Sequence, residues 1–383
     1  MKLIAILMIR DEEHIINRCL SSIEGVVDAY SIIDTGSTDS TIELCETFLQ
    51  THVGQISKHA WNNFGYNRTH SFETTRDYVR DVLKWELSET YGLLMDADMV
   101  FSNVSLKNTE LTSPGYSILH ILGNLRYRLP TLLSLAYEWR SIGVTHEYWT
   151  GGTTTELNEE VCYMNEVADG ISHIMNHKFL RDKQLLEDHL KDKPDDVRNI
   201  FYLARTYDSL NMYTEAIDMF ERRIELGGWE EEIWYSYYSI GLIYKDLLID
   251  IPFEEYMLKA FSLNPRRAEP IFHLAHYFGH KQQVYKAKYY CDIGKTISPN
   301  QIDILFIEPQ LYGAVFDVIE KELIYPSASQ EVSLPVYVSE SLPMLPESME
   351  DESPTTLYLS EPSDSDVSAE PRIQTSSDAH LLL

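Results

Sequence analysis

The first hundred residues alternate between short apolar runs of strand length and stretches with helical spacing. An apolar run over residues 1–9 is followed by charged residues and by apolar positions at helical spacing over residues 15–23. A second apolar run, residues 29–33, is followed by a polar turn and another helical pattern over residues 42–49. This order of strand, helix, strand and helix predicts an open α/β sheet, in which ligands bind outside the carboxyl ends of the strands.

The polar turn after the second apolar run predicts the start of a helix. Asp39 or Ser40 is expected to cap the helix that follows, because short polar side chains accept hydrogen bonds from the first free amides. Glu43 lies three residues beyond Ser40, which is the spacing of a capping box.

A third apolar run, residues 91–95, ends directly in Asp96 and Asp98. Because side chains alternate along a strand, these two carboxylates are expected to point the same way. Carboxylates held close repel each other unless a cation or a proton lies between them, and oxygen ligands of this kind suit Mg²⁺ or Mn²⁺. A solvated acidic turn is the alternative interpretation. With Asp34 and Asp39, the pair is expected to converge on one crevice.

Several short motifs occur in a fixed order over the first hundred residues. They are Arg10-Asp11-Glu12-Glu13, Asp34-Thr35-Gly36-Ser37-Thr38-Asp39, Phe64 with Arg68, and Asp96-Ala97-Asp98. In order and spacing they resemble the family-2 glycosyltransferases of the GT-A fold. The resemblance implies a nucleotide-diphospho-sugar donor, a divalent metal ion (Mn²⁺ or Mg²⁺) and a hexosyltransferase-like, inverting reaction.

The resemblance also implies roles for individual residues. Asp98, with Asp96, would bridge the metal ion to the donor diphosphate, and Arg68 would lie near the donor phosphates. The residues implied to hold the nucleotide are Arg10, Glu12, Asp34 and Asp39. The sequence departs from the family pattern at Asp11 and Thr69, where Asn is usual, and this leaves donor selectivity open.

A second motif, residues 140–149, contains His146 and Glu147 after a glycine. It is similar to one branch of the same family that carries helical repeats downstream. The resemblance implies that His146 completes the metal site and that Glu147 is the catalytic base, and both roles suit the chemistry of the side chains. A hydrogen-bonded turn is the alternative, and Glu138 and Asp169 are then the next candidates for the base.

Charged residues shortly after this motif have two interpretations. Lys178, Arg181 and Asp182 resemble the linker that leads into the repeats in that branch. Lys178 and Arg181 would either reach a diphosphate oxygen or be ordinary surface cations on a helix, and the second interpretation is favoured. The segment 150–160, rich in Thr, Gly and Glu, is expected to be a mobile loop.

From about residue 194 the chain shows a regular helical pattern. A small residue recurs at Ala204, Gly241 and Ala275, and each is followed at the same spacing by a helix breaker. The breakers are Gly228, Pro265 and Pro299. A period of about 34–37 residues is typical of tetratricopeptide-like repeats, in which small residues let paired helices pack closely. Phe253 stands where this pattern usually has Ala, so the middle repeat is degenerate.

Composition limits the remaining choices. The net charge of −29 argues against nucleic acid as a partner, because phosphate binding needs basic patches. Four scattered cysteines without paired spacing suggest a reducing compartment, and no apolar stretch is long enough to span a bilayer. These features predict a cytoplasmic protein without a transmembrane segment.

The sequence therefore predicts three parts: a GT-A-type, Rossmann-like α/β domain over residues 1–193, an all-α tetratricopeptide-like domain over residues 194–326, and a disordered, acidic, Ser/Pro/Glu-rich tail over residues 327–383. The expected function is metal-dependent transfer of a sugar to an unidentified glycan, lipid-linked or protein acceptor. The sequence leaves open a peptide or protein partner for the repeats. The alternatives are a nucleotidyltransferase and a catalytically degenerate scaffold that binds partners through its repeats.

Overall fold

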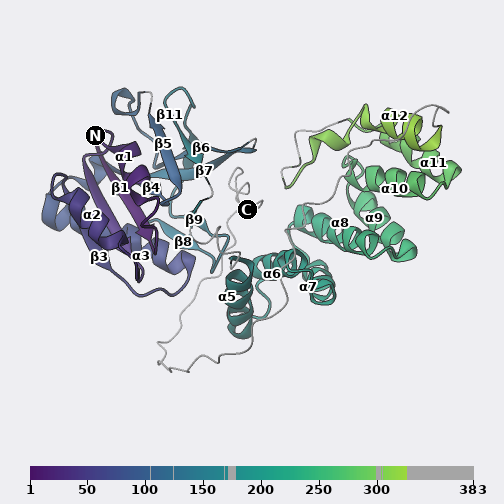
Figure 1. Cartoon of the computed structure of the whole chain (residues 1–383), viewed down its shortest axis with the longest axis horizontal. Helices are drawn as coiled ribbons and strands as arrows, with labels where there is room; N and C mark the ends of the chain where they lie inside the picture. Colours follow the sequence, from purple (N-terminus) through teal and green to yellow (C-terminus); the bar gives the residue numbers. More distant parts are fainter. Residues whose placement is uncertain are drawn as a thin grey trace. The chain divides into compact units, whose positions relative to one another are not determined.

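The computed structural model describes residues 1–325 except for 104, 124, 168, 171–177, 299–302 and 304. The described residues form a sheet domain and a region of paired helices (Figure 1). Both parts of the fold class expected for this region are therefore confirmed, a Rossmann-like α/β domain followed by helical repeats. The predicted acidic tail, residues 327–383, lies outside the described residues.

The sheet domain is built on a mixed sheet with the strand order β3-β2-β1-β4-β7-β6-β11-β5, and β10 pairs with β6. The strands are β1 (Lys2–Ile9), β2 (Ala29–Asp34), β3 (Gly54–Lys58), β4 (Thr90–Met95), β5 (Met99–Asn103), β6 (Gly115–Leu122), β7 (Leu125–Ser134), β10 (Thr154–Glu156) and β11 (Cys162–Glu166). β1, β2, β3 and β4 run parallel, whereas β7 pairs antiparallel with β4. The ends of β1, β2 and β4 therefore lie at one edge, as the sequence predicts.

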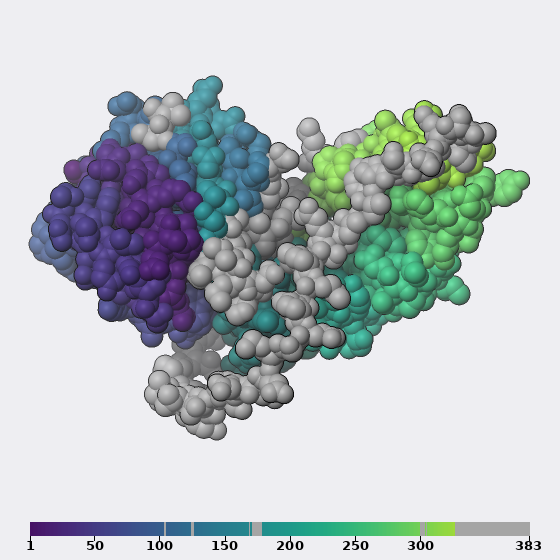
Figure 2. Space-filling view, in the orientation of Figure 1, coloured from purple at the N-terminus to yellow at the C-terminus, as the bar shows by residue number. Residues whose placement is uncertain are grey.

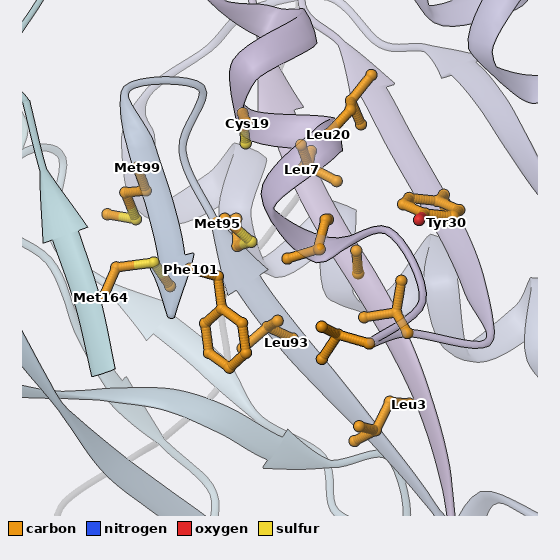
Figure 3. Close-up of a cluster of buried hydrophobic side chains, with 14 of the residues drawn as sticks. Leu3, Leu7, Cys19, Leu20, Tyr30, Leu93, Met95, Met99, Phe101 and Met164 are labelled. Atoms are coloured by element: carbon orange, nitrogen blue, oxygen red, sulfur yellow. The ribbon is translucent and has the colours of Figure 1, made fainter. Parts of the chain in front are cut away.

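Helices cover both faces of the parallel strands. The first face carries α1 (Ile16–Ile23) and α2 (Thr41–Leu49), and the second carries α3 (Phe64–Tyr78). Because β1 alternates, Leu3 and Leu7 contribute to the first core, which is drawn in Figure 3, while Ile4 and Ile6 pack with Phe72 in the second. A strand buried on both faces explains why residues 3–9 are continuously apolar.

Short elements complete the sheet domain. A hairpin of β8 (Arg140–Ile142) and β9 (Tyr148–Thr150) follows the sheet strands, and α3 continues into a π-helical turn, Val79–Leu83. Single 3₁₀ turns lie at Leu87–Glu89 and Leu106–Asn108. Part of the segment expected to be a mobile loop, residues 150–160, is a strand in the structure, because β10 pairs with the edge of β6.

The expected capping box at the start of α2 is wrong. Ser40 occupies the N-cap position, but its side chain makes no capping hydrogen bond. Asp39 is used instead: its Oδ1 accepts from the Thr41 amide at 3.0 Å, and its Oδ2 accepts from the Glu13 amide at 3.1 Å. One carboxylate thus joins the loop after β2 to the loop after β1, and the capping pattern in sequence does not reveal this long-range contact.

The helical region consists of antiparallel helix pairs that stack in chain order. Its helices are α5 (Lys178–Asp192), α6 (Val197–Ser209), α7 (Tyr213–Leu226), α8 (Glu230–Asp246), α9 (Asp250–Leu263), α10 (Glu269–His280) and α11 (Val284–Gly294), followed by a 3₁₀ turn (Pro309–Leu311), α12 (Val315–Ile319) and a π-helical turn (Glu320–Ile324). The colours pass in order from teal to yellow along the stack (Figure 2), as expected where each pair contacts its chain neighbours. The repeat pattern is therefore confirmed.

Small residues lie where the paired helices approach most closely. Ala204 and Ala275 are fully buried, and a Cβ built on Gly241 would lie 2.9 Å from the Met257 side chain. Phe253, at the degenerate position, is also fully buried and packs on Tyr277 with ring centroids 4.6 Å apart. The middle repeat thus keeps its packing with a larger residue.

The expected domain boundary at residues 193 and 194 falls between α5 and α6. Leu186 of α5 belongs to the same hydrophobic core as Phe201 of α6, so α5 packs on the first repeat pair. All four cysteines are buried and none forms a disulfide. No helix among the described residues is long and apolar enough to cross a membrane.

We predict that Ala275→Trp lowers the free energy of unfolding by about 1–3 kcal/mol, because a large ring has no space at this fully buried position. The measurement is thermal and denaturant unfolding of the full chain. Tyr285→Trp is the matched control, since Tyr285 is 93% exposed on α11. An unchanged unfolding curve for Ala275→Trp would show that the assigned helix packing is wrong.

Candidate functional site

Arg68 is the centre of the candidate site at the carboxyl end of β4. Its NH1 and NH2 groups donate to the two carboxylate oxygens of Asp96 at 2.9 and 2.8 Å, and its Nε–H donates to Glu147. Burial alone would lower the pKa of Arg68, but the carboxylates of Asp96 and Glu147 overcome this effect and raise it. The structure therefore brings together three residues that the sequence predicted for the donor, the metal ion and the base.

The contact between Arg68 and Glu147 depends on a close approach of two backbones. The first turn of α3 packs against the β8–β9 hairpin, and the Gly65 amide donates to the Gly143 carbonyl at 3.0 Å. A Cβ built on Gly65 would lie 2.3 Å from that carbonyl oxygen and 2.9 Å from the Ser141 oxygen. Only glycine fits here without a backbone shift. Gly65 therefore sets the distance between the helix that carries Arg68 and the loop that carries Glu147.

Asp98 lies in a region of concentrated negative charge. Burial raises its pKa to about 7, and the carboxylates of Asp96, Glu166 and Asp169 add to the effect. Glu166 is hydrogen-bonded to His120. The Nδ1 atom of His120 lies 2.6 Å from the Glu166 carboxylate, and its Nε2 atom lies 2.8 Å from the Thr131 hydroxyl. A cation would be favoured beside Asp98 for the same reason that a proton is.

Glu12 and the segment around Asp169 also reach this region. A Cβ built on Gly170 would lie 3.4 Å from Asp98 Oδ2 and 3.5 Å from Glu12 Oε1. Asp169 is held by a bidentate pair with Arg18, at 2.6 and 2.7 Å. Glu12, in the loop after β1, therefore lies in the same region as Asp98. Its implied contact with the nucleotide stays a prediction.

The other residues predicted to hold the nucleotide are mainly engaged with their own loops. Asp34 is buried and accepts the Ser37 amide at 2.9 Å, and Asp39 joins two loops as described above. Arg10 is half exposed and lies 3.6 Å from the Asp11 carboxylate. Their proposed nucleotide contacts stay predictions.

Asp11, the first departure from the family pattern, has a left-handed backbone with a φ of 55°. Its carboxylate accepts the Thr38 amide at 2.6 Å, so the side chain fixes the neighbouring loop. Asn and Asp are the residues besides glycine that adopt this conformation most readily. Either residue therefore suits the backbone at this position.

His146 packs against the first repeat helix. Its ring stacks on Tyr202 with centroids 4.3 Å apart, and Arg198 donates to its carbonyl at 3.1 Å. Its φ of 50° is unusual for a residue other than glycine, and these contacts support the conformation. The metal-binding role of His146 stays a prediction.

Lys178 is the main site residue that the sequence interpretation undervalued. Burial lowers its pKa, and the charges of Asp182, Asp98 and Glu147 oppose this effect, which places the ammonium group near the candidate site. Asp182 is 1% exposed, and its neighbour Arg181 lies over the Phe64 ring at 4.7 Å. From the sequence, Lys178, Arg181 and Asp182 could be recognised only as charged residues on a helix. Their burial depends on the tertiary fold.

The described residues were compared with the ligand set that a metal ion needs. Among the residues that the structure describes, no group of three His, Cys, Asp or Glu side chains is arranged to hold a metal ion. Mg²⁺ and Mn²⁺ commonly take only one or two protein carboxylates and complete their shell with substrate phosphates and water. Asp98, in its negatively charged surroundings, fits that mode of binding.

Comparisons with known proteins give distant structural likenesses. No protein-family model matches the chain, and no match was found among curated proteins. S. aureus TarS 1-349 in complex with UDP-GlcNAc is similar at 14% identity, with 68% of this chain and 91% of TarS covered and a TM-score of 0.40. YrrB, a TPR protein with an unusual peptide-binding site, is similar at 19% identity over 31% of this chain, with a TM-score of 0.27. The chain spans 59% of the length of YrrB.

We predict that Gly65→Ala destabilises the protein by about 1–3 kcal/mol, because the new methyl group meets a backbone oxygen that cannot rotate away. Tyr66→Ala is the control on the same helix, since Tyr66 is half exposed and its loss creates no clash. Thermal unfolding measures both variants. Equal stability of Gly65→Ala and wild type would mean that α3 and the β8–β9 hairpin are not in close contact.

A second prediction concerns the charge of Asp98. Its pKa in the folded protein is raised. Ionisation of Asp98 therefore contributes a loss of stability as pH rises from about 4 to about 7, by ~1.4 kcal/mol for each pH unit. Asp98→Asn cannot ionise, so in metal-free buffer its stability advantage over wild type should grow across this range and level off above it. Unfolding at about pH 5 and about pH 8 measures the difference. Asp218→Asn, at an exposed position on α7, is the control. A difference in stability between Asp98→Asn and wild type that does not change with pH would contradict the expectation.

Proposed function

We propose that the sheet domain is a glycosyltransferase of the GT-A type that transfers a sugar, with inversion, from a nucleotide-diphospho-sugar to an acceptor hydroxyl. The observation that carries the proposal is the cluster at the end of β4, where Arg68 binds both Asp96 and Glu147 beside Asp98. The site offers cationic groups for a diphosphate, a carboxylate for a divalent ion and a second carboxylate for a proton. Ligands of open α/β sheets bind at this edge.

Arg68 and Lys178 would receive the diphosphate. The Arg68 guanidinium donates to two carboxylates, and a guanidinium binds phosphate oxygens in the same bidentate way. An arriving diphosphate would therefore compete with Asp96 and Glu147 for Arg68. The ammonium group of Lys178 would add positive charge as the leaving group develops.

Glu147 would act as the general base. Its carboxylate is 15% exposed and pairs with Arg68, and it becomes available as a base when the diphosphate takes Arg68. When the acceptor oxygen forms a bond to the anomeric carbon, the bond from that carbon to the diphosphate breaks and Glu147 takes the acceptor proton. Direct displacement, with the acceptor oxygen attacking from the side opposite the leaving group, gives inversion.

Asp98, with Asp96, would hold a divalent ion if one binds. Bound Mn²⁺ or Mg²⁺ would neutralise charge on the departing diphosphate. For Asp96 to contribute, its contact with Arg68 must loosen, which is consistent with a guanidinium that shifts toward the donor phosphates. Asp98 needs no such release from Arg68.

The proposal is tested by nucleoside-diphosphate release from a panel of nucleotide-diphospho-sugars, with Mn²⁺ and the purified full chain. Glu147→Gln should reduce transfer by about 10²–10⁴-fold while Mn²⁺-dependent binding of nucleoside diphosphate stays close to wild type. Asp98→Ala should abolish that binding, as measured by calorimetric titration.

The matched control is Glu156→Gln on β10, because Glu156 is exposed and lies away from Arg68, pairing with Arg128 at 3.2 Å. It should react like wild type. If wild-type protein binds no nucleoside diphosphate in the presence of metal ions, the glycosyltransferase proposal is wrong. If Glu147→Gln keeps full turnover, the base is a different residue, with Glu138 and Asp169 the next candidates.

A further inference from the structure

One face of the helical repeats contacts a segment of the chain that is neither helix nor strand. The face is formed by the first helix of each repeat pair and by Arg267, two residues before the start of α10, and we call it the repeat face. Its residues are Arg205, Glu231, Tyr235, Tyr238, Arg267 and Glu269. The segment that lies on it, residues 305–308, follows the last repeat pair in sequence.

The repeat face binds the backbone of this segment through charged side chains. The Leu305 amide donates to the Glu231 carboxylate at 2.6 Å, and the Glu308 amide donates to Glu269 at 3.3 Å. Arg267 donates to the carbonyls of Leu305 and Phe306, both at 2.9 Å. Donors and acceptors of the chain are thus satisfied by side chains of other helices, which is how peptide-binding sites hold an extended ligand.

Arg267 and Glu269 are held in place by contacts within the repeat face itself. Arg267 and Glu269 are 1% and 0% exposed and form an ion pair at 2.8 Å. The Arg267 guanidinium also stacks over the Trp234 ring at 3.8 Å. Buried charges held in this way are costly unless every group is paired, and the segment's carbonyls supply partners for Arg267.

Side chains of the segment fill specific places on the repeat face. Phe306 packs on Tyr235 with ring centroids 4.7 Å apart, and the Arg205 guanidinium lies 4.3 Å from the Phe306 ring centre. Leu305 is 1% exposed. The Tyr238 hydroxyl donates to the Glu308 carboxylate at 2.7 Å. The repeat face therefore contacts an apolar residue, Leu305, an aromatic residue, Phe306, and, two positions later, an acidic residue, Glu308.

The segment is held in a conformation that its own sequence does not favour. Phe306 has a φ of 46°, and a left-handed backbone is unfavourable for a bulky residue. Contacts with the repeat face must therefore offset this cost. A segment that is strained when bound is easier to displace than a regular helix would be.

From these contacts we infer that the repeat face is a peptide-binding site for extended chains with an apolar–aromatic–any–acidic pattern, and that residues 305–308 are its resident ligand. An external peptide of the same pattern, presented by a partner protein, binds only when this segment leaves. The inference is independent of the proposed glycosyltransferase activity, because it uses no residue of the sheet domain.

The test uses a fluorescein-labelled synthetic peptide with the sequence of residues 303–312 and fluorescence anisotropy. Full-length Phe306→Ala/Glu308→Ala should bind the peptide at least about tenfold more tightly than wild type, because the wild-type site is open for only a small fraction of the time. A peptide with the same two replacements should not bind this variant. Full-length Tyr285→Ala, changed at an exposed position on α11, should behave like wild type.

If the double variant melts like wild type but does not bind the natural peptide, residues 305–308 are part of the repeat core and the inference is wrong. Equal binding by wild type would also overturn it. Hydrogen exchange of the unmodified wild-type protein gives a second measurement in case the double variant does not fold. The amides of Leu305 and Glu308 should exchange faster than those of α8 through local release, and equal exchange rates would contradict the inference.

Discussion

The guanidinium of Arg68 is the interaction on which the candidate site depends. It connects Asp96, at the end of a sheet strand, to Glu147, in a hairpin loop that is distant in sequence. One cation therefore lies between two carboxylates that would otherwise repel each other. This arrangement works only because Gly65 lets α3 and the hairpin approach at backbone distance. The chemistry of the site thus rests on a packing constraint several residues away from it.

The charge balance of the candidate site differs from that of the acidic chain as a whole. Burial, together with the nearby carboxylates of Asp96, Glu166 and Asp169, makes Asp98 difficult to ionise. Arg68 pairs with Asp96 and Arg18 pairs with Asp169, but the pKa of Asp98 stays raised. A site with excess negative charge and fixed guanidinium groups nearby is suited to a ligand that arrives together with a cation. The net charge of the whole chain is therefore a poor guide to this local balance.

The sequence predicted most of the fold because the relevant patterns are local. Strand length, alternation and helical spacing located β1, α1, β2 and β4, and the spacing of Ala204, Gly241 and Ala275 located the repeats. The expected capping box failed because Asp39 makes contacts across two loops. For Lys178 the sequence favoured an ordinary surface cation over a diphosphate contact, because its burial depends on residues far away in sequence. Local patterns predict elements, whereas the environment of a charged side chain requires the tertiary structure.

The loop that carries Glu147 also contacts the helical repeats. Its neighbour His146 stacks on Tyr202 of α6, and Arg198 of the same helix donates to the His146 carbonyl. The loop that carries Glu147 is consequently held from two sides, by Gly65 on α3 and by α6. Without α6, the left-handed backbone at His146 would lose the contacts that support it. The first repeat helix therefore takes part in fixing the orientation of Glu147, so the helical region contributes to the geometry of the candidate site as well as to its own packing.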